Sequence, residues 1–179
     1  MRTLKESILD KDFDVDYESL FIKVLKDVIL GDCKNKFTYE LKHNYEGLRN
    51  CICIKGKPTV LNVNLGGLYK ELHEFGIDGV MFEDCPRLWF FLMEKKTVIK
   101  NFTIYSDAQS IYFCDESGYN GTFEFENSSI RTSAEVIAQE SAVSLKKKST
   151  LQCSDTHTLY GSIMKDGSSK IIVSKIIAL

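Results

Sequence analysis

The sequence predicts a mainly β protein with an N-terminal helix, built as a short irregular β-solenoid. Three observations lead to this fold class. Short apolar-alternating segments recur from about residue 48 onward, turn-forming residues separate them, and the later segments follow one another about every seven residues. Alternation at a period of two buries one set of side chains and exposes the other. Three faces of this size would close a coil of roughly 20 residues, which suits a parallel β-helix.

Length and composition fit one soluble globular domain. The chain has 179 residues, of which 44% are hydrophobic and 27% are charged, and its net charge is −2. This charge gives no general attraction to nucleic acid or to an anionic membrane, and no apolar run approaches the roughly 18–20 residues that span a bilayer. The N-terminus meets an acidic stretch instead of a signal-peptide apolar region. We therefore expect a cytoplasmic protein, or one inside a particle assembled there, without membrane or nucleic-acid partners.

Residues 1–14 are predicted to form an acidic arm that is separate from a single domain over residues 15–179. Leu4, Ile8 and Leu9 make a small apolar face on this arm. A short polar segment of this kind becomes ordered against a partner or against the body of the domain. These three side chains are therefore candidate binding residues.

A helix is predicted over residues 15–31, with its core from Asp16 to Leu30. Its apolar residues recur at spacings of three and four and form one stripe: Tyr17, Leu20, Phe21, Val24, Leu25, Val28 and Ile29. Asp14 or Asp16 can accept hydrogen bonds in the first turn, and Gly31 can take the left-handed conformation that ends a helix. Such a helix could cover the open end of the strand-rich region over residues 37–179.

A second, shorter helix is predicted from Gly67 to Phe75, between a strand that ends near Leu65 and one that begins near Val80. The order strand, short helix, strand resembles the unit of leucine-rich repeats. Residues 80–88 resemble the turn that follows the strand in such repeats. In its pattern, the body of the chain thus resembles irregular leucine-rich or β-helix solenoids.

Antiparallel pairing is the alternative for the strand-rich region. Residues 118–121 lie between two alternating segments and could form a hairpin, and Asp166-Gly167 could form another before the β-branched last strand. An antiparallel β-sandwich, or a sheet with a covering helix, therefore stays open beside the solenoid.

The residues that could bind metal or carry out catalysis lack the necessary spacing. Six cysteines and three histidines are present, but neither a zinc-type pair of pairs nor a catalytic motif occurs. The sequence therefore predicts no metal and no cofactor. Lys146-Lys147-Lys148 is a basic run that we interpret as a solvated corner of the coil.

Two pairs of side chains are candidate sites on strands. Glu124 and Glu126 alternate with phenylalanines, so both project from one outer face and could act as general acid and base. Trp89 and Phe91 likewise share a face, opposite to their apolar neighbours. An exposed aromatic pair is typical of a binding interface, so Trp89 and Phe91 are the preferred site.

The opening Leu4-Lys5-Glu6-Ser7-Ile8-Leu9-Asp10, followed by Asp12-Phe13-Asp14, resembles the start of uncharacterised accessory proteins of tailed bacteriophages that infect gut bacteria. The resemblance implies a phage-encoded accessory or virion-associated protein, whose arm serves as a shared tag for packaging or docking. It implies no catalytic residue.

These patterns lead to a non-enzymatic protein-interaction module with an unidentified protein partner. Two alternatives stay open. One is a small carbohydrate-active β-helix enzyme that uses Glu124 and Glu126. The other is a self-associating structural subunit, a homo-oligomer whose last strand pairs between chains.

Overall fold

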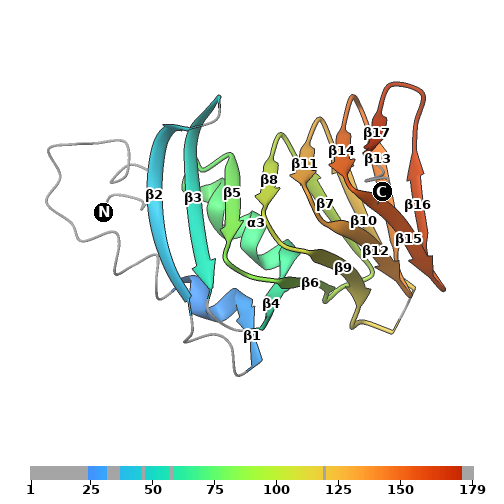
Figure 1. Ribbon diagram of the computed structural model, residues 1–179, viewed down its shortest axis with the longest axis horizontal. Coiled ribbons are helices and arrows are strands. Elements are labelled where there is room, and N and C mark those ends of the chain that lie inside the picture. The colour runs from blue at the N-terminus through green and yellow to red at the C-terminus, as the bar shows by residue number, and fades with distance from the viewer. Residues whose placement is uncertain (1–23, 32–36, 46, 57–58, 119, 175–179) are drawn as a thin grey trace, which may run out of the picture.

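The computed structural model describes residues 24–31, 37–45, 47–56, 59–118 and 120–174 (Figure 1). Its strands stack in three sheets, A, B and C, around one core and form a β-solenoid of about five coils. The predicted fold class is thus confirmed. The chain passes through sheets B, A and C in turn, and each passage around the core makes one coil.

The three sheets are defined by the order of their strands. Sheet A holds β1 (Ile29–Leu30), β4 (Val60–Asn64), β6 (Arg87–Leu92), β9 (Ser110–Asp115), β12 (Glu135–Gln139) and β15 (Asp155–Leu159). Sheet B holds β2 (Phe37–Tyr45), β3 (Leu48–Gly56), β5 (Gly79–Glu83), β8 (Thr103–Ser106), β11 (Ser129–Thr132), β14 (Thr150–Cys153) and β17 (Lys170–Val173). Sheet C holds β7 (Lys96–Lys100), β10 (Thr122–Glu126), β13 (Ala142–Lys146) and β16 (Ser162–Lys165).

Coil length is greatest at the N-terminal end of the solenoid and smallest at the C-terminal end. The first coil is the longest, because Cys51 of β3 pairs with Gly79 of β5. Later coils are shorter and equal, since Thr150 pairs with Lys170 and Ala142 pairs with Ser162. The predicted period of about 20 residues is therefore confirmed for the C-terminal coils. All these strand pairs are parallel.

The N-terminal end of the solenoid is built differently. Helix α3 (Leu65–Glu74) follows β4 and occupies the place that a strand of sheet C takes in later coils. Asn64 caps this helix by accepting a hydrogen bond from the Gly67 backbone N–H at 3.1 Å. A Cβ atom at Gly66 would lie 2.9 Å from Oγ1 of Thr97, so the helix needs glycine where it approaches β7. The helix predicted from Gly67 to Phe75 is confirmed, with a start two residues earlier.

The core is apolar and comes from all three sheets. Phe82, Phe90, Phe113, Phe123 and Phe125 are all completely or almost completely buried, and their rings contact one another across the interior. Burying aromatic rings in offset and edge-on contacts is a large source of stabilisation. Because these rings come from strands of successive coils, the coils stabilise one another.

A column of buried serines holds the corner between sheets C and B. The Phe102 backbone N–H donates to the Ser128 hydroxyl, the Ser128 N–H donates to Ser149, and the Ser149 N–H donates to Ser169. Each of the two inner hydroxyls also donates to a carbonyl, as Ser149 does to Lys146 at 2.7 Å. Buried N–H groups at this corner are thereby satisfied from one coil to the next.

Two predictions about local structure are wrong. Neither predicted hairpin forms, because the strands on either side of residues 118–121, and those on either side of Asp166-Gly167, belong to different sheets. The chain pairs with the previous coil there, which a tight turn alone does not reveal. Parallel pairing between coils likewise excludes the antiparallel sandwich. Antiparallel pairs are confined, within the described residues, to β1 with β4 and β2 with β3.

The predicted helix over residues 15–31 ends earlier than expected. Its described part covers residues 24–28, and Ile29–Leu30 instead form β1 beside Val63 and Asn62 of β4. Residues 15–23 and the acidic arm over residues 1–14 lie outside the described residues. None of the described helices is long and apolar enough to cross a membrane.

Candidate interaction surface

Three aromatic side chains gather on the outer face of sheet A, the face turned away from the core. Trp89 and Phe91 alternate with the buried Leu88, Phe90 and Leu92 along β6, as the sequence predicts, but both are half-buried and not fully exposed as expected. Their rings lie 6.0 Å apart. Tyr112 of β9 pairs with Trp89 in the sheet register, and the two rings stack at 4.2 Å with planes 9° apart. We call Trp89, Phe91 and Tyr112 the aromatic cluster.

The cluster continues into apolar and polar surroundings. Ile137 follows Tyr112 in register and is 5% exposed, although it points outward from sheet A. Asn62 lies beside Trp89 on the N-terminal side, and Arg87 lies at the exposed edge of the same face. An apolar centre with a polar rim is the arrangement found in protein–protein interfaces.

Ring stacking limits what the cluster can bind. In the Trp89–Tyr112 pair, each ring covers one face of the other at 4.2 Å. One face of each ring is therefore unavailable to a partner. An aromatic side chain binds another planar or apolar group through its ring faces. The stack therefore has fewer free ring faces than two isolated rings have. This geometry favours contact with protein side chains over a row of stacked sugars.

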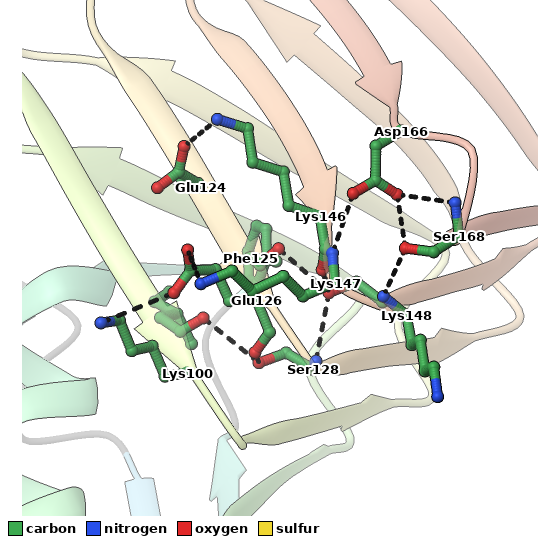
Figure 2. Close-up of polar contacts among 12 residues, drawn as sticks. Lys100, Glu124, Phe125, Glu126, Ser128, Lys146, Lys147, Lys148, Asp166 and Ser168 are labelled. Carbon is green, nitrogen blue, oxygen red and sulfur yellow. Dashed lines mark hydrogen bonds and ion pairs between the residues drawn. The ribbon is translucent and has the colours of Figure 1, made fainter.

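The candidate carboxylates lie in a lattice of ion pairs on the outer face of sheet C (Figure 2). Oε1 of Glu124 is 2.6 Å from Nζ of Lys146 and 3.5 Å from Nζ of Lys96. Glu126 pairs with Lys100 at 3.6 Å and with Lys147 at 3.3 Å. Both glutamates point outward as predicted, but lysines from the coils before and after cover them, and the Glu124 side chain is only 7% exposed.

This lattice sets the chemistry of Glu124. The hydrogen bond from Lys146 outweighs desolvation and lowers the pKa of the Glu124 carboxyl below its ordinary value, and Lys96 adds to the effect. A general acid in glycoside hydrolysis needs a raised pKa. The arrangement therefore favours a structural role and gives no support to the carbohydrate-active alternative.

The basic run has a structural role as well. Lys146 and Lys147 neutralise Glu124 and Glu126, whereas the Lys147 and Lys148 backbones take left-handed conformations at the corner. Their N–H groups donate to Asp166 and to Ser168 of the next coil (Figure 2). Lys146-Lys147-Lys148 is thus a corner, as interpreted from the sequence.

A small groove lies on the outer face of sheet B. Its volume is about 220 Å³, and it is lined by Met81, Phe82, Glu83, Tyr105, Ser106, Asp107 and Arg131. The guanidinium of Arg131 lies 5.9 Å from the centre of the Tyr105 ring. Small-molecule sites usually measure about 300–1,000 Å³, so this groove is smaller than a typical small-molecule site.

The described thiols lie in the core, where the thiolate form is disfavoured. Cys51, Cys53, Cys85, Cys114 and Cys153 are buried and make no disulfide. Burial raises the pKa of Cys51 and of Cys114 to about 12 and that of Cys153 to about 11. Such thiols stay protonated and are poor nucleophiles and poor metal ligands. Among the residues that the structure describes, no cluster of three His, Cys, Asp or Glu side chains could hold a metal ion.

The sequence predicted part of this surface. Trp89 and Phe91 lie together, whereas the other candidate binding residues, Leu4, Ile8 and Leu9, lie outside the described residues. Tyr112 was missed because its place beside Trp89 depends on the register between two coils. Comparisons with protein-family models, with curated proteins and with solved structures returned no match.

Proposed function

We propose that the chain is a non-enzymatic protein-interaction module and that the aromatic cluster contacts its protein partner. The stacked Trp89 and Tyr112 rings on an outer sheet face carry this proposal. Tryptophan and tyrosine are enriched among the residues that dominate binding energy at protein interfaces. A stack fixed by two strands of a solenoid also loses little side-chain entropy when a partner binds.

The phage resemblance of the N-terminal segment gives this module a context. We propose that it is a phage-encoded accessory or virion-associated protein. In this proposal the arm over residues 1–14 makes a second contact with the partner, in addition to the contact of the sheet A face. Two contacts joined in one chain raise the effective concentration of each at its target.

A photo-crosslinking experiment tests the role of the sheet A face. A photoreactive phenylalanine analogue at position 91 should trap the partner in an extract of the cell that encodes the chain. The same analogue at position 105 is the matched control, because Tyr105 points outward from sheet B. Equal capture from both positions, or capture from position 105 alone, contradicts the proposal.

The captured protein then allows a direct binding assay. Trp89 is the single tryptophan of the chain, so its fluorescence reports whether the partner covers the cluster. We expect a blue shift on binding, and we expect Tyr112→Ser with Phe91→Ser to weaken binding by about tenfold or more. Arm removal should weaken binding without changing the blue shift. Unchanged affinity in the double variant would rule out the cluster as the contact.

A further inference from the structure

The C-terminal end of the solenoid carries three open sheet edges. Strands β15, β16 and β17 are the last members of sheets A, C and B, and each has a strand neighbour on one side only among the described residues. The outer side of each strand holds backbone N–H and C=O groups that can pair with another strand. Because the last coils have the same length, the three open edges all lie in the last coil, at one end of the solenoid.

Exposed apolar side chains concentrate in the same coil. In the described part of the chain, the strongly exposed large hydrophobic residues are Met93, Leu159, Tyr160, Met164 and Ile172. Four of these five belong to the last coil, and Tyr160 is 93% exposed with a left-handed φ of 55°. An exposed apolar group of this kind at open sheet edges marks an interaction surface.

The N-terminal end of a second copy cannot pair with all three strands of this coil. At the N-terminal end, β1 and β2 run antiparallel to their neighbours, and α3 stands where sheet C would have a strand. If one copy stacked its last coil on the first coil of another copy, β16 would meet a helix and stay unpaired. A second C-terminal end, by contrast, offers three strand edges.

From this asymmetry we infer that two copies of the chain associate tail to tail through β15, β16 and β17. A twofold axis perpendicular to the solenoid reverses the direction of the strands, so edges that meet pair in antiparallel fashion. One sheet then meets itself and the other two meet each other. Such a contact uses the same surface on both copies and closes as a dimer.

The side chains select which sheets meet. Along β16, Ile163 points toward the core and Met164 points outward, whereas along β17 Val173 points inward and Ile172 outward. The register that places Met164 opposite Ile172 of the second copy also places Ile163 opposite Val173 of that copy. Opposed side chains in an antiparallel pair approach to about 4.5–5.5 Å between Cβ atoms. We therefore assign β16 to β17 of the second copy, and β15 to β15.

This register satisfies both faces of the joined sheet. Met164 and Ile172, which are 51% and 47% exposed in the single chain, cover each other on the outer face. Ile163 and Val173, which already pack against the core, extend it across the junction. Lys165 follows at the end of β16 on the same side as Ile163, opposite Ile171 of the second copy. It is exposed in the single chain, so its ammonium can reach water at the corner.

The mass of the full chain in solution tests the inference. We expect a concentration-dependent dimer in sedimentation equilibrium over about 1–100 µM. Met164→Lys combined with Ile172→Lys should raise the dissociation constant by about a hundredfold, because paired apolar positions would then carry charge. Met93→Lys is the matched control, since Met93 is 49% exposed but lies outside the last coil, and it should leave the dimer unchanged.

A disulfide links the proposed contact to specific residues. Met164 and Ile172 lie in different sheets of one chain, so Met164→Cys with Ile172→Cys should give a covalent dimer on mild oxidation and no bond within a chain. Met93→Cys with Ile172→Cys should stay unlinked. All these positions point outward, so the melting temperature should change little. A full chain that is monomeric throughout, a dimer that survives the double lysine variant, an open-ended polymer, or equal linkage from position 93 would each overturn the inference.

Discussion

Gly121 offers a sharp test of how tightly the coils are stacked. It lies at the corner between β9 and β10, and its backbone does not take a left-handed conformation. A Cβ atom built there would lie 2.6 Å from the Lys95 carbonyl oxygen and 3.1 Å from that of Glu94, and it would overlap Cδ2 of Leu92. Ordinary contacts between non-bonded heavy atoms need about 3.5–4.0 Å. Gly121→Ala therefore forces the backbone of one coil away from the next.

Hydrogen bonds make that movement costly. The Lys95 carbonyl accepts from the Thr122 N–H at 3.0 Å, and the Gly121 N–H donates to the Asp115 carboxylate at 2.7 Å. Overpacking a rigid site typically lowers the free energy of unfolding by about 1–3 kcal/mol. Because hydrogen bonds fix both sides of this corner, we expect a loss of about 3 kcal/mol for Gly121→Ala. For a domain of this size, that cost lowers the melting temperature by about 6–12 °C.

Thermal and urea unfolding, followed by circular dichroism, measure this loss. Gly167→Ala is the matched control, because a Cβ atom at Gly167 would meet no heavy atom within 4 Å and its φ is not left-handed. We expect the control to be neutral, or up to about 1 kcal/mol more stable, through the unfolded state. If Gly121→Ala unfolds within about 0.5 kcal/mol of the wild type, the coils are not packed as tightly as described.

Two further predictions concern buried polar contacts. Ser149→Ala removes a fully buried hydroxyl that accepts a hydrogen bond from the Ser128 N–H at 3.1 Å. Urea unfolding should therefore show a loss of about 1–3 kcal/mol in the free energy of unfolding. Ser133→Ala is the control, because Ser133 is exposed, and it should change stability by less than about 0.5 kcal/mol. Glu124→Gln should destabilise the protein at pH 7 by about 1 kcal/mol or more. Because the folded pKa of Glu124 lies below its unfolded value of about 4.3, its contribution is complete above that pH and is lost as the pH falls through the folded pKa. Unfolding curves of wild type and Glu124→Gln should therefore converge in acid, and a gap that widens in acid would contradict this reasoning.

Local alternation made much of each strand predictable. Phe123 and Phe125 point inward while Glu124 and Glu126 point outward, as the period of two requires. The length of the C-terminal coils was also predictable, because turn-forming residues mark each corner of these coils. Both features depend on neighbours within a few residues, which any window of the sequence contains.

Pairing between coils was not predictable in the same way. Tyr112 stacks on Trp89 of the preceding coil, and Glu124 pairs with Lys96 and Lys146 on either side. These contacts depend on coil lengths that differ between the first coil and the last, and an error of one residue would turn each side chain to the opposite face. The two lysines that neutralise Glu124 could therefore not be predicted from the sequence of β10 alone.

The wrong local predictions have the same origin. Asp166-Gly167 has the composition of a hairpin turn, but a solenoid corner needs the same backbone freedom and uses the same residues. The predicted helix likewise extended to Leu30, yet Ile29 pairs with Val63 of β4, where it is buried. Tertiary pairing overrides the local periodicity at this point.

Equal spacing in the final coils lets the chain lengthen by duplication. A repeated block of one whole coil from the region that follows Glu135 would restore the same three strands in the same register. Each such block would extend the solenoid by about 4.8 Å without disturbing the ends. The first coil, which is longer and has a helix in place of a strand, offers no comparable unit. Genetic variation in length is therefore best tolerated in the C-terminal half, where a gain or loss of one whole unit preserves every cross-coil contact.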